Sequence, residues 1–227
     1  LASSRLTRSS LGRCDATLHL AFDSVLKFQG DAIVNAANIG CLGGGGIDGM
    51  VNCEGGHDLF DARWALPVVA KEDGIPVRCM TGDAKITIAG NLPCSKVIHA
   101  VGPDFRMGNA QHEDLIKLEM AYKSAMARAQ ENELTSIGFC IISAGVYRGS
   151  CPLTTIVKTA LTTIAKHAYI GLETVVFCGF TPEEQSIISH LATELAQELL
   201  LVGNGVVPTC RLASFFPVVP SPSLPPL

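Results

Sequence analysis

Short apolar segments alternate with amphipathic helical patterns along most of the chain, and this alternation limits the fold more than any other feature. The strand-like segments are residues 18–22, 32–34, 84–88, 96–101, 136–142 and 173–178. The helical patterns cover 112–133, 153–168 and 183–201, and a shorter helix is expected at 50–56. Apolar strands separated by helices are typical of parallel sheets covered on both faces. The sequence therefore predicts an α/β fold around a mostly parallel sheet.

Size and charge exclude some classes of protein. The chain has 227 residues, of which 48% are hydrophobic and 17% charged, so it can bury a sizeable core. We expect a single domain over residues 15–205. The net charge of −4 argues against binding to long nucleic acids, which requires many basic contacts to phosphates.

The cysteines favour a reduced, intracellular protein. The nine cysteines are scattered, with no C-x-x-C pair and none of the cysteine and histidine spacings of a zinc module. We therefore expect no metal and no cofactor. No apolar run reaches the length of a membrane span without a charge or a breaker, so we expect no membrane association.

The two ends differ in composition from the rest of the chain. Residues 1–14 are rich in Arg and Ser and contain no acidic residue, as in a mitochondrial transit peptide. We favour the simpler interpretation, a disordered N-terminal extension, and therefore expect a cytoplasmic or nuclear location with a mitochondrial one as the alternative. Residues 206–227 form a proline-rich tail.

A run of four glycines, 43–46, follows the second predicted strand. Without side chains, the backbone N–H groups of such a loop can approach a ligand closely. The helix expected directly after it would add the partial positive charge of its N-terminus. The glycine loop therefore predicts a phosphate-binding site.

Two further loops also lie where predicted strands lead into helices, the edge at which α/β sheets bind ligands. The first, 143–152, carries Gly145 and Gly149, which keep its backbone accessible. The second, 179–184, holds Thr181 and Glu184 at the spacing of a capping box. Its Phe180 offers a flat surface for a base. Two glycine-bearing loops could grip a diphosphate from both sides.

Other phosphate-binding motifs do not fit. Gly44-x-Gly46-x-x-Gly49 matches the dinucleotide fingerprint literally, but the acidic strand end expected about 20 residues later is missing. No G-K-[ST] follows the glycines, which excludes a P-loop, and no nucleophile elbow is present.

Four ordered motifs resemble the macrodomain family, and specifically its MacroD type. They are N-A-A-N at 35–38, G-G-G-G-I-D-G at 43–49, V-I-H-A-V-G-P at 97–103 and I-S-A-G-V-Y at 142–147. The resemblance covers roughly residues 15–200. It implies a three-layer α/β/α fold with a mixed, mostly parallel sheet. It also implies that the chain binds ADP-ribose and cleaves it from modified side chains or from O-acetyl-ADP-ribose.

The resemblance also implies roles for individual residues. Asp31 resembles the acceptor for the adenine amino group, although a turn aspartate is the alternative, and Ala32 beside it is a further expected ligand contact. Asn38 matches the carboxamide that holds the distal ribose, and Asp48 matches the carboxylate beside its C1″ atom. Asn35 is interpreted as a residue that ties the loop together.

The remaining expected ligand contacts come from both glycine-bearing loops. They are Gly44, Gly45, Gly46 and Ile47 on one side, Ser143, Ala144, Gly145, Val146 and Tyr147 on the other, and Phe180 at the adenine. Ser143 could instead be satisfied by backbone, and Phe180 could be a packing residue. His99 lies in an apolar strand and is interpreted as a hydrogen-bonded core residue.

Three places depart from the family pattern. After the D-G of the glycine motif, this chain has Met50-Val51-Asn52 where the family often has a small residue followed by Ile and His. Arg148 stands where the family usually has a small residue. The segment 61–78 is longer than usual and is expected to form a surface excursion. None of them touches Asn38 or Asp48, so we expect activity to be retained and substrate preference to differ.

The sequence thus predicts a hydrolase that removes mono-ADP-ribose from acidic side chains and deacetylates O-acetyl-ADP-ribose. The alternatives are a reader that binds ADP-ribose without turning it over and a phosphatase acting on ADP-ribose 1″-phosphate. The expected partners are ADP-ribose and mono-ADP-ribosylated proteins, and we expect a monomer.

Overall fold

The computed structural model describes residues 16–106 and 111–202, which contain a six-stranded sheet. The strands follow the order β1-β8-β7-β2-β6-β5, and only the edge strand β5 runs antiparallel to its neighbour in this described sheet. Their bounds are β1 (Thr17–Ala21), β2 (Ala32–Ala37), β5 (Ala84–Ile88), β6 (Lys96–Val101), β7 (Ser136–Phe139) and β8 (Thr174–Cys178). The predicted mixed, mostly parallel sheet is confirmed.

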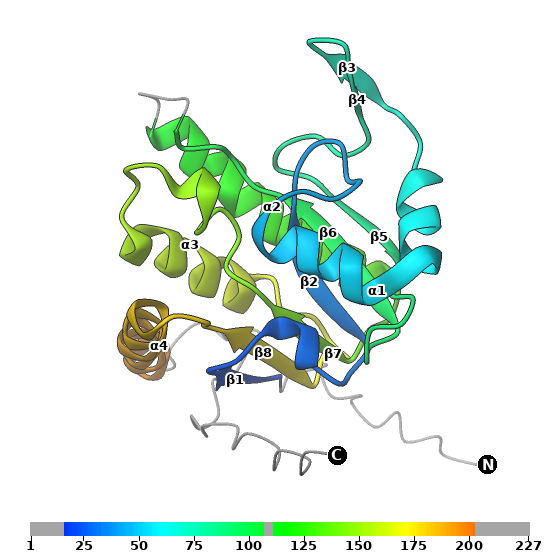
Figure 1. The fold of residues 1–227 in the computed structure, drawn as a ribbon. Helices are drawn as coiled ribbons and strands as arrows, with labels where there is room; N and C mark the ends of the chain where they lie inside the picture. Colours follow the sequence, from blue (N-terminus) through cyan, green and yellow to red (C-terminus); the bar gives the residue numbers. More distant parts are fainter. Residues whose placement is uncertain (1–15, 107–110, 203–227) are drawn as a thin grey trace, which may run out of the picture.

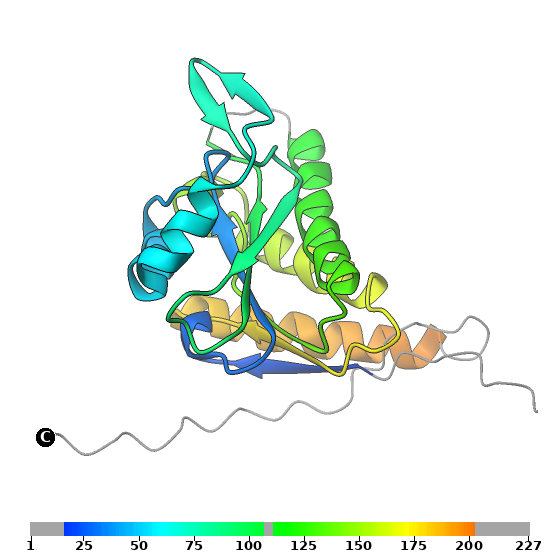
Figure 2. The same ribbon diagram turned by 90° about the vertical axis from the view of Figure 1, so that its right-hand side faces the viewer.

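Helices cover both faces of this sheet, which gives three layers (Figures 1 and 2). One face carries α1 (Gly46–Trp64) and the short 3-10 helix η1 (Val25–Lys27). The other face carries α2 (Gln111–Glu131), α3 (Leu153–Lys166) and α4 (Pro182–Val202). The predicted capping box starts α4, because Thr181 and Glu184 each accept a hydrogen bond from the other's backbone N–H.

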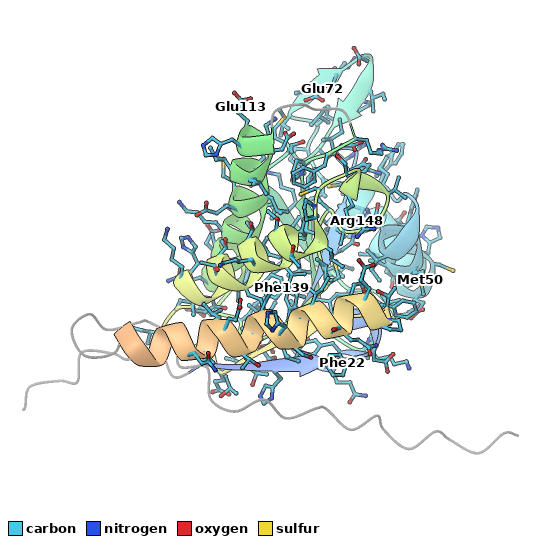
Figure 3. The ribbon with its side chains drawn as sticks, turned by 90° about the vertical axis from the view of Figure 1, so that its left-hand side faces the viewer. Phe22, Met50, Glu72, Glu113, Phe139 and Arg148 are labelled. Atoms are coloured by element: carbon cyan, nitrogen blue, oxygen red, sulfur yellow. The ribbon has the colours of Figure 1, made fainter. Side chains whose placement is uncertain are left out.

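The two faces bury separate apolar clusters of different size. On β2, Ile33 packs toward α1 while Val34 packs toward α2 and α3, as the two-residue period of a strand requires. The larger cluster lies under α2, α3 and α4 and includes Phe139, which is fully buried and is labelled in Figure 3. The smaller cluster lies under α1. A sheet covered on both sides explains why its strands are apolar throughout.

The segment 61–78 was expected to be a surface excursion. It comprises the end of α1 and a hairpin of β3 (Ala70–Glu72) and β4 (Ile75–Val77), which projects from the body of the molecule (Figure 1). At its turn Asp73 and Gly74 both have positive φ, of 48° and 81°, as a tight hairpin turn requires. Glu72, labelled in Figure 3, marks this projection.

Several helix and strand boundaries differ from the expectation, and two of them bear on the site. The helix predicted at 50–56 begins earlier and ends later, at Gly46 and Trp64, because its four glycines hide the helical pattern. β7 ends at Phe139, and the following apolar residues turn toward the ligand edge of the sheet.

The expected N-terminal extension and proline-rich tail lie outside the described residues. Across 16–106 and 111–202, the structure contains no helix with the length and apolarity needed to cross a membrane.

Candidate active site

A pocket of about 290 Å³ lies at the carboxyl ends of β2 and β7. Most of the predicted site residues stand at this edge of the sheet and line the pocket. They are Asn38, Gly44, Gly45, Gly46, Ile47, Asp48, Ser143, Ala144, Gly145, Val146 and Tyr147. The two glycine-bearing loops therefore meet across one cavity, as the sequence predicts.

The glycine loop forms one wall of the pocket and leads directly into α1. Gly45 is the N-cap residue, and Gly46 begins the helix with a φ of 60°. A Cβ atom at Gly45 or Gly46 would meet nothing within 4 Å, so this backbone is open to a ligand. The unpaired N–H groups and the dipole at the start of α1 favour an anion here.

The opposite wall is the loop that follows β7. Ser143 has a φ of 59°, and its hydroxyl donates a hydrogen bond of 2.8 Å to the carbonyl of Pro103. A Cβ at Gly145 would again meet nothing within 4 Å. A short 3-10 helix, η2 (Val146–Arg148), follows. The Ser143 hydroxyl thus holds two loops together, in agreement with the alternative that backbone satisfies it.

Asn38 closes the glycine loop on itself. Its carboxamide oxygen accepts hydrogen bonds from the N–H groups of Gly40 and Cys41, at 3.0 and 3.2 Å. Its amide nitrogen donates to the carbonyl of Gly43 at 2.9 Å and lies beside Gly44 at the pocket wall. This nitrogen carries a second hydrogen that can be donated to a ligand.

Asp48 lies in the first turn of α1 and is only 3% exposed. Its Oδ1 atom accepts hydrogen bonds of 2.7 Å from Asn35 and from the guanidinium of Arg63. Its Oδ2 atom has no hydrogen-bond partner among the described residues, and a Cβ at Gly44 would lie 3.2 Å from it. One oxygen is therefore fixed by protein, and the other is a buried acceptor beside Gly44 of the pocket wall that no described protein group uses.

A buried chain of polar groups leads from Asp48 into the sheet. Asn35 Nδ2 lies 3.2 Å from His99 Nδ1, and His99 Nε2 lies 2.9 Å from the hydroxyl of Thr87. Burial, and to a lesser degree the charge of Arg63, holds the pKa of His99 well below its usual range. A neutral His99 that donates from Nε2 accepts at Nδ1 from Asn35. His99 is a core residue that orients Asn35, not a base in the pocket.

Asp31 and Ala32 do not belong to this pocket, which corrects their prediction as ligand contacts. They stand at the amino end of β2, whereas the pocket lies at its carboxyl end. The Asp31 carboxylate accepts hydrogen bonds from the backbone N–H groups of Thr135 and Ser136 and from the Thr135 hydroxyl. Ala32 is fully buried in the core. Asp31 fastens the start of β2 to the start of β7.

Asn35 and Phe180 also lie outside the pocket lining. Asn35 is fully buried and contacts Asp48 rather than open space, so it supports the site from behind. Phe180 follows β8 at the correct edge of the sheet and is 71% exposed. Its role at a base stays a prediction.

Several residues of the site were not anticipated. Ala36, Ala37, Gly102, Ile141 and Ile142 complete the lining, because each stands at the carboxyl end of a strand or just beyond it. The strand directions could have identified them. Arg63 could not be found this way, because it stands fifteen residues after Asp48 in the segment 61–78 that the sequence predicts to be a surface excursion.

The residues that depart from the family pattern do not line the pocket. Arg148 forms an ion pair with Glu183 at 3.6 Å, which links η2 to the start of α4. Arg148 and Met50 lie on the same side of the molecule (Figure 3). Asp48 is the only charged residue in the pocket lining that the structure describes, so an anion here would be held by backbone N–H groups.

Comparison with known proteins decides the family. The model of the macro domain matches residues 34–178. This chain belongs to the macrodomain family. Curated relatives named O-acetyl-ADP-ribose deacetylase, from Escherichia fergusonii and from Escherichia coli K12, are both 36% identical over 183 residues. In both cases the match covers 80% of this chain and 98% of the relative.

Solved macrodomains share the fold. The Oceanobacillus iheyensis macrodomain with ADP superposes with a TM-score of 0.67 at 28% identity, covering 79% of this chain and 92% of that one. The Trypanosoma brucei macrodomain in complex with ADP-ribose gives a TM-score of 0.62 at 31% identity, covering 76% and 68%. The predicted macrodomain fold is confirmed.

Proposed function

We propose that this macrodomain binds ADP-ribose in the pocket between its two glycine-bearing loops and hydrolyses esters of it. The substrates would be O-acetyl-ADP-ribose and proteins that carry mono-ADP-ribose on acidic side chains. The relatives named O-acetyl-ADP-ribose deacetylase and the structure of a relative with ADP-ribose support this assignment. The protein substrate goes beyond both and rests on the chemistry of the pocket.

The shape and polarity of the pocket suit ADP-ribose. Backbone N–H groups of Gly44–Gly46 and of the loop around Gly145 line opposite walls, so they can contact a diphosphate from two sides. The start of α1 adds a favourable field for the negative charge. The exposed Phe180 is the proposed platform for the adenine.

The observation that carries the proposal is the pair formed by Asn38 and Asp48. A Cβ atom on Gly44 would lie 3.0 Å from the Asn38 amide nitrogen and 3.2 Å from Asp48 Oδ2, so both atoms lie next to this residue of the pocket wall. One is a donor and the other an acceptor. Such a pair can hold the distal ribose and a water in a fixed orientation.

Ester hydrolysis needs little more than this. For an acidic side chain, water attacks C1″, the bond from C1″ to the ester oxygen breaks, and a carboxylate leaves. The proton of the water passes to Asp48 or to a phosphate oxygen of the substrate. A carboxylate is a good leaving group and needs no strong general acid. An N-glycosidic link to arginine has a far more basic leaving group and should be cleaved poorly.

The test is to incubate the protein with O-acetyl-ADP-ribose and, separately, with a protein mono-ADP-ribosylated on glutamate. Mass spectrometry of both products should show free ADP-ribose and the restored acid. An arginine-linked substrate serves as the matched control and should be released far more slowly. Tight binding of ADP-ribose with no turnover of either ester would make the domain a reader instead.

A further inference from the structure

Arg63 is a fully buried cation whose hydrogen bonds all lie close to the pocket. Its Nε donates to the carbonyl of Cys41, one terminal nitrogen donates to Asp48 Oδ1 at 2.7 Å, and the other lies 3.5 Å from Asn52 Oδ1. Cys41 precedes the glycine loop and Asp48 follows it. The guanidinium therefore connects both ends of the phosphate loop.

This contact is possible only because α1 is broken in the middle. In a straight helix, fifteen residues would separate Asp48 from Arg63 by about 22 Å along the axis. Gly56 interrupts the helix with φ 70° and ψ −161°, and the second half turns away from the first (Figure 1). The bend returns Arg63 to the side of α1 on which Asp48 lies.

The break is built into the chain by glycines and by the turn that follows β5. A Cβ at Gly56 would lie 2.6 Å from Asn91 Nδ2, and its φ is unfavourable for other residues. The N–H of Asn91 donates to the carbonyl of Gly55, and a Cβ at Gly90 would collide with that carbonyl. These contacts fix the angle of the bend.

We infer that Arg63 is a positioning residue for Asp48, and this inference rests on the proposed function. The guanidinium fixes Oδ1, so that Oδ2 is the remaining acceptor, buried beside Gly44 of the pocket wall and without a partner among the described residues. Without Arg63, Asp48 would be a buried carboxylate with Asn35 as its single fixed partner and could rotate. The bend at Gly56 then serves catalysis as well as folding, because it supplies Arg63.

The planar geometry of the Arg63 guanidinium matters as well as its charge. A guanidinium can donate to the Cys41 carbonyl and to Asp48 at the same time, in directions fixed by its geometry. A lysine ammonium is a point charge on a flexible stem, so it can neutralise Asp48 without fixing the loop. Lysine at this position should therefore restore only part of the function.

The alternative is that Arg63 is a purely structural cation that stabilises the bend. A double-mutant cycle separates the two roles. The four proteins are wild type, Arg63→Met, Asp48→Asn and the double variant, with kcat and KM measured on O-acetyl-ADP-ribose. Arg78→Met is the matched control. Arg78 is also largely buried, and its guanidinium stacks on Trp64 at 5.1 Å.

A positioning role predicts that Arg63→Met lowers kcat by about 10- to 100-fold with a smaller change in KM. The same substitution should change kcat little when Asp48 is already Asn, because Arg63 acts through it. Arg63→Lys should recover part of kcat, and Arg78→Met should keep the wild-type value. An equal fold-loss in both Asp48 backgrounds, or no loss in either, would refute the positioning role.

Folding and function can be distinguished within the same set. Removing one partner of a buried ion pair costs more stability than removing both, so the double variant should unfold at higher denaturant than Arg63→Met. If Arg63→Met does not fold, Arg63→Lys replaces it in the cycle. If wild type hydrolyses neither ester, the proposed function fails. The same four proteins are then compared by their affinity for ADP-ribose. Additive losses of affinity from the two substitutions would refute the inference, and non-additive losses would support it.

Discussion

Two aspartates flank strand β2, and they have opposite surroundings. Asp31 stands before the strand, and its Oδ2 atom accepts three hydrogen bonds from Thr135 and Ser136. Asp48 follows the loop after the strand, and one of its oxygens has no partner among the described residues. One Asp31 oxygen is therefore held by three protein donors in a half-buried setting, while Asp48 keeps a buried acceptor that no described protein group uses.

The difference follows from the direction of the strand. The amino ends of parallel strands lie where the preceding helices end. Polar groups at this edge, such as the Asp31 carboxylate, hydrogen-bond one strand to another. The carboxyl ends lead into the loops before helices, where glycines and helix N-termini leave donors free. The edge of the sheet, more than the type of residue, decides which carboxylate can take part in binding.

The largest expected effect is at the loop opposite Asp48. Gly145→Glu should abolish ADP-ribose binding, because its side chain would enter the pocket and place a negative charge where the diphosphate lies. The protein should still fold, since Gly145 has a φ of −89° and a Cβ there meets nothing within 4 Å. Calorimetry measures the affinity. Ser150→Glu is the control, because this exposed residue adds the same charge outside the pocket lining. A folded Gly145→Glu variant with wild-type affinity would remove this loop from the site.

The next effect concerns the donor that shares the wall with Asp48. Asn38→Ala should lower ester hydrolysis by roughly 10²-fold, the scale of losing a group that positions the reacting atoms. Affinity for free ADP-ribose should fall less, because catalysis depends most on contacts made in the transition state. Steady-state kinetics and calorimetry give the two values. Parallel losses in both would make Asn38 a ground-state contact only.

A smaller effect is expected on stability at the bend in α1. Gly56→Ala should lower the free energy of unfolding by about 1–3 kcal/mol, because alanine must adopt a positive φ and its Cβ meets Asn91. Urea denaturation measures the loss. Gly171→Ala is the matched control. Its φ is also positive, but a Cβ there meets nothing within 4 Å, so its loss should be smaller.

The smallest effect is expected at the amino end of β2. Burial opposes ionisation of Asp31, but the hydrogen bonds from Thr135 and Ser136 outweigh it and lower the pKa of its carboxyl. Its ionised form therefore stabilises the fold at neutral pH, and this contribution is lost as the pH falls through the lowered pKa. Asp31→Asn should be slightly less stable than wild type at pH 7 in urea denaturation, with the gap narrowing in acid. ADP-ribose affinity should not change.

Much of this arrangement could be predicted from the sequence, and the exceptions have physical reasons. The positions 84–88 and 96–101 read correctly as strands because their apolar pattern is continuous and bounded by turn residues. The glycine loop and the loop at 143–147 meet at one pocket, as expected. Asp31 was misplaced, although the direction of β2 alone assigns it to the far edge.

The pairing of Asp48 with Arg63 could not be predicted from the sequence. It depends on a bend at Gly56 that is fixed by Asn91, a residue from a different part of the chain. Helical periodicity describes residues on one straight axis and cannot show a contact created by breaking that axis. The buried chain from Asn35 to His99 likewise depends on the pairing of β2 with β6.

The most direct test compares the two aspartates in one assay. Release of ADP-ribose from a glutamate-linked protein substrate is measured for wild type, Asp48→Asn and Asp31→Asn under identical conditions, with the product identified by mass. We predict release by wild type, a loss of roughly 10²-fold or more for Asp48→Asn, and wild-type release for Asp31→Asn. Equal release by all three proteins would contradict the assignment of Asp48 to the reaction, and absence of release from wild type would contradict the proposed activity itself.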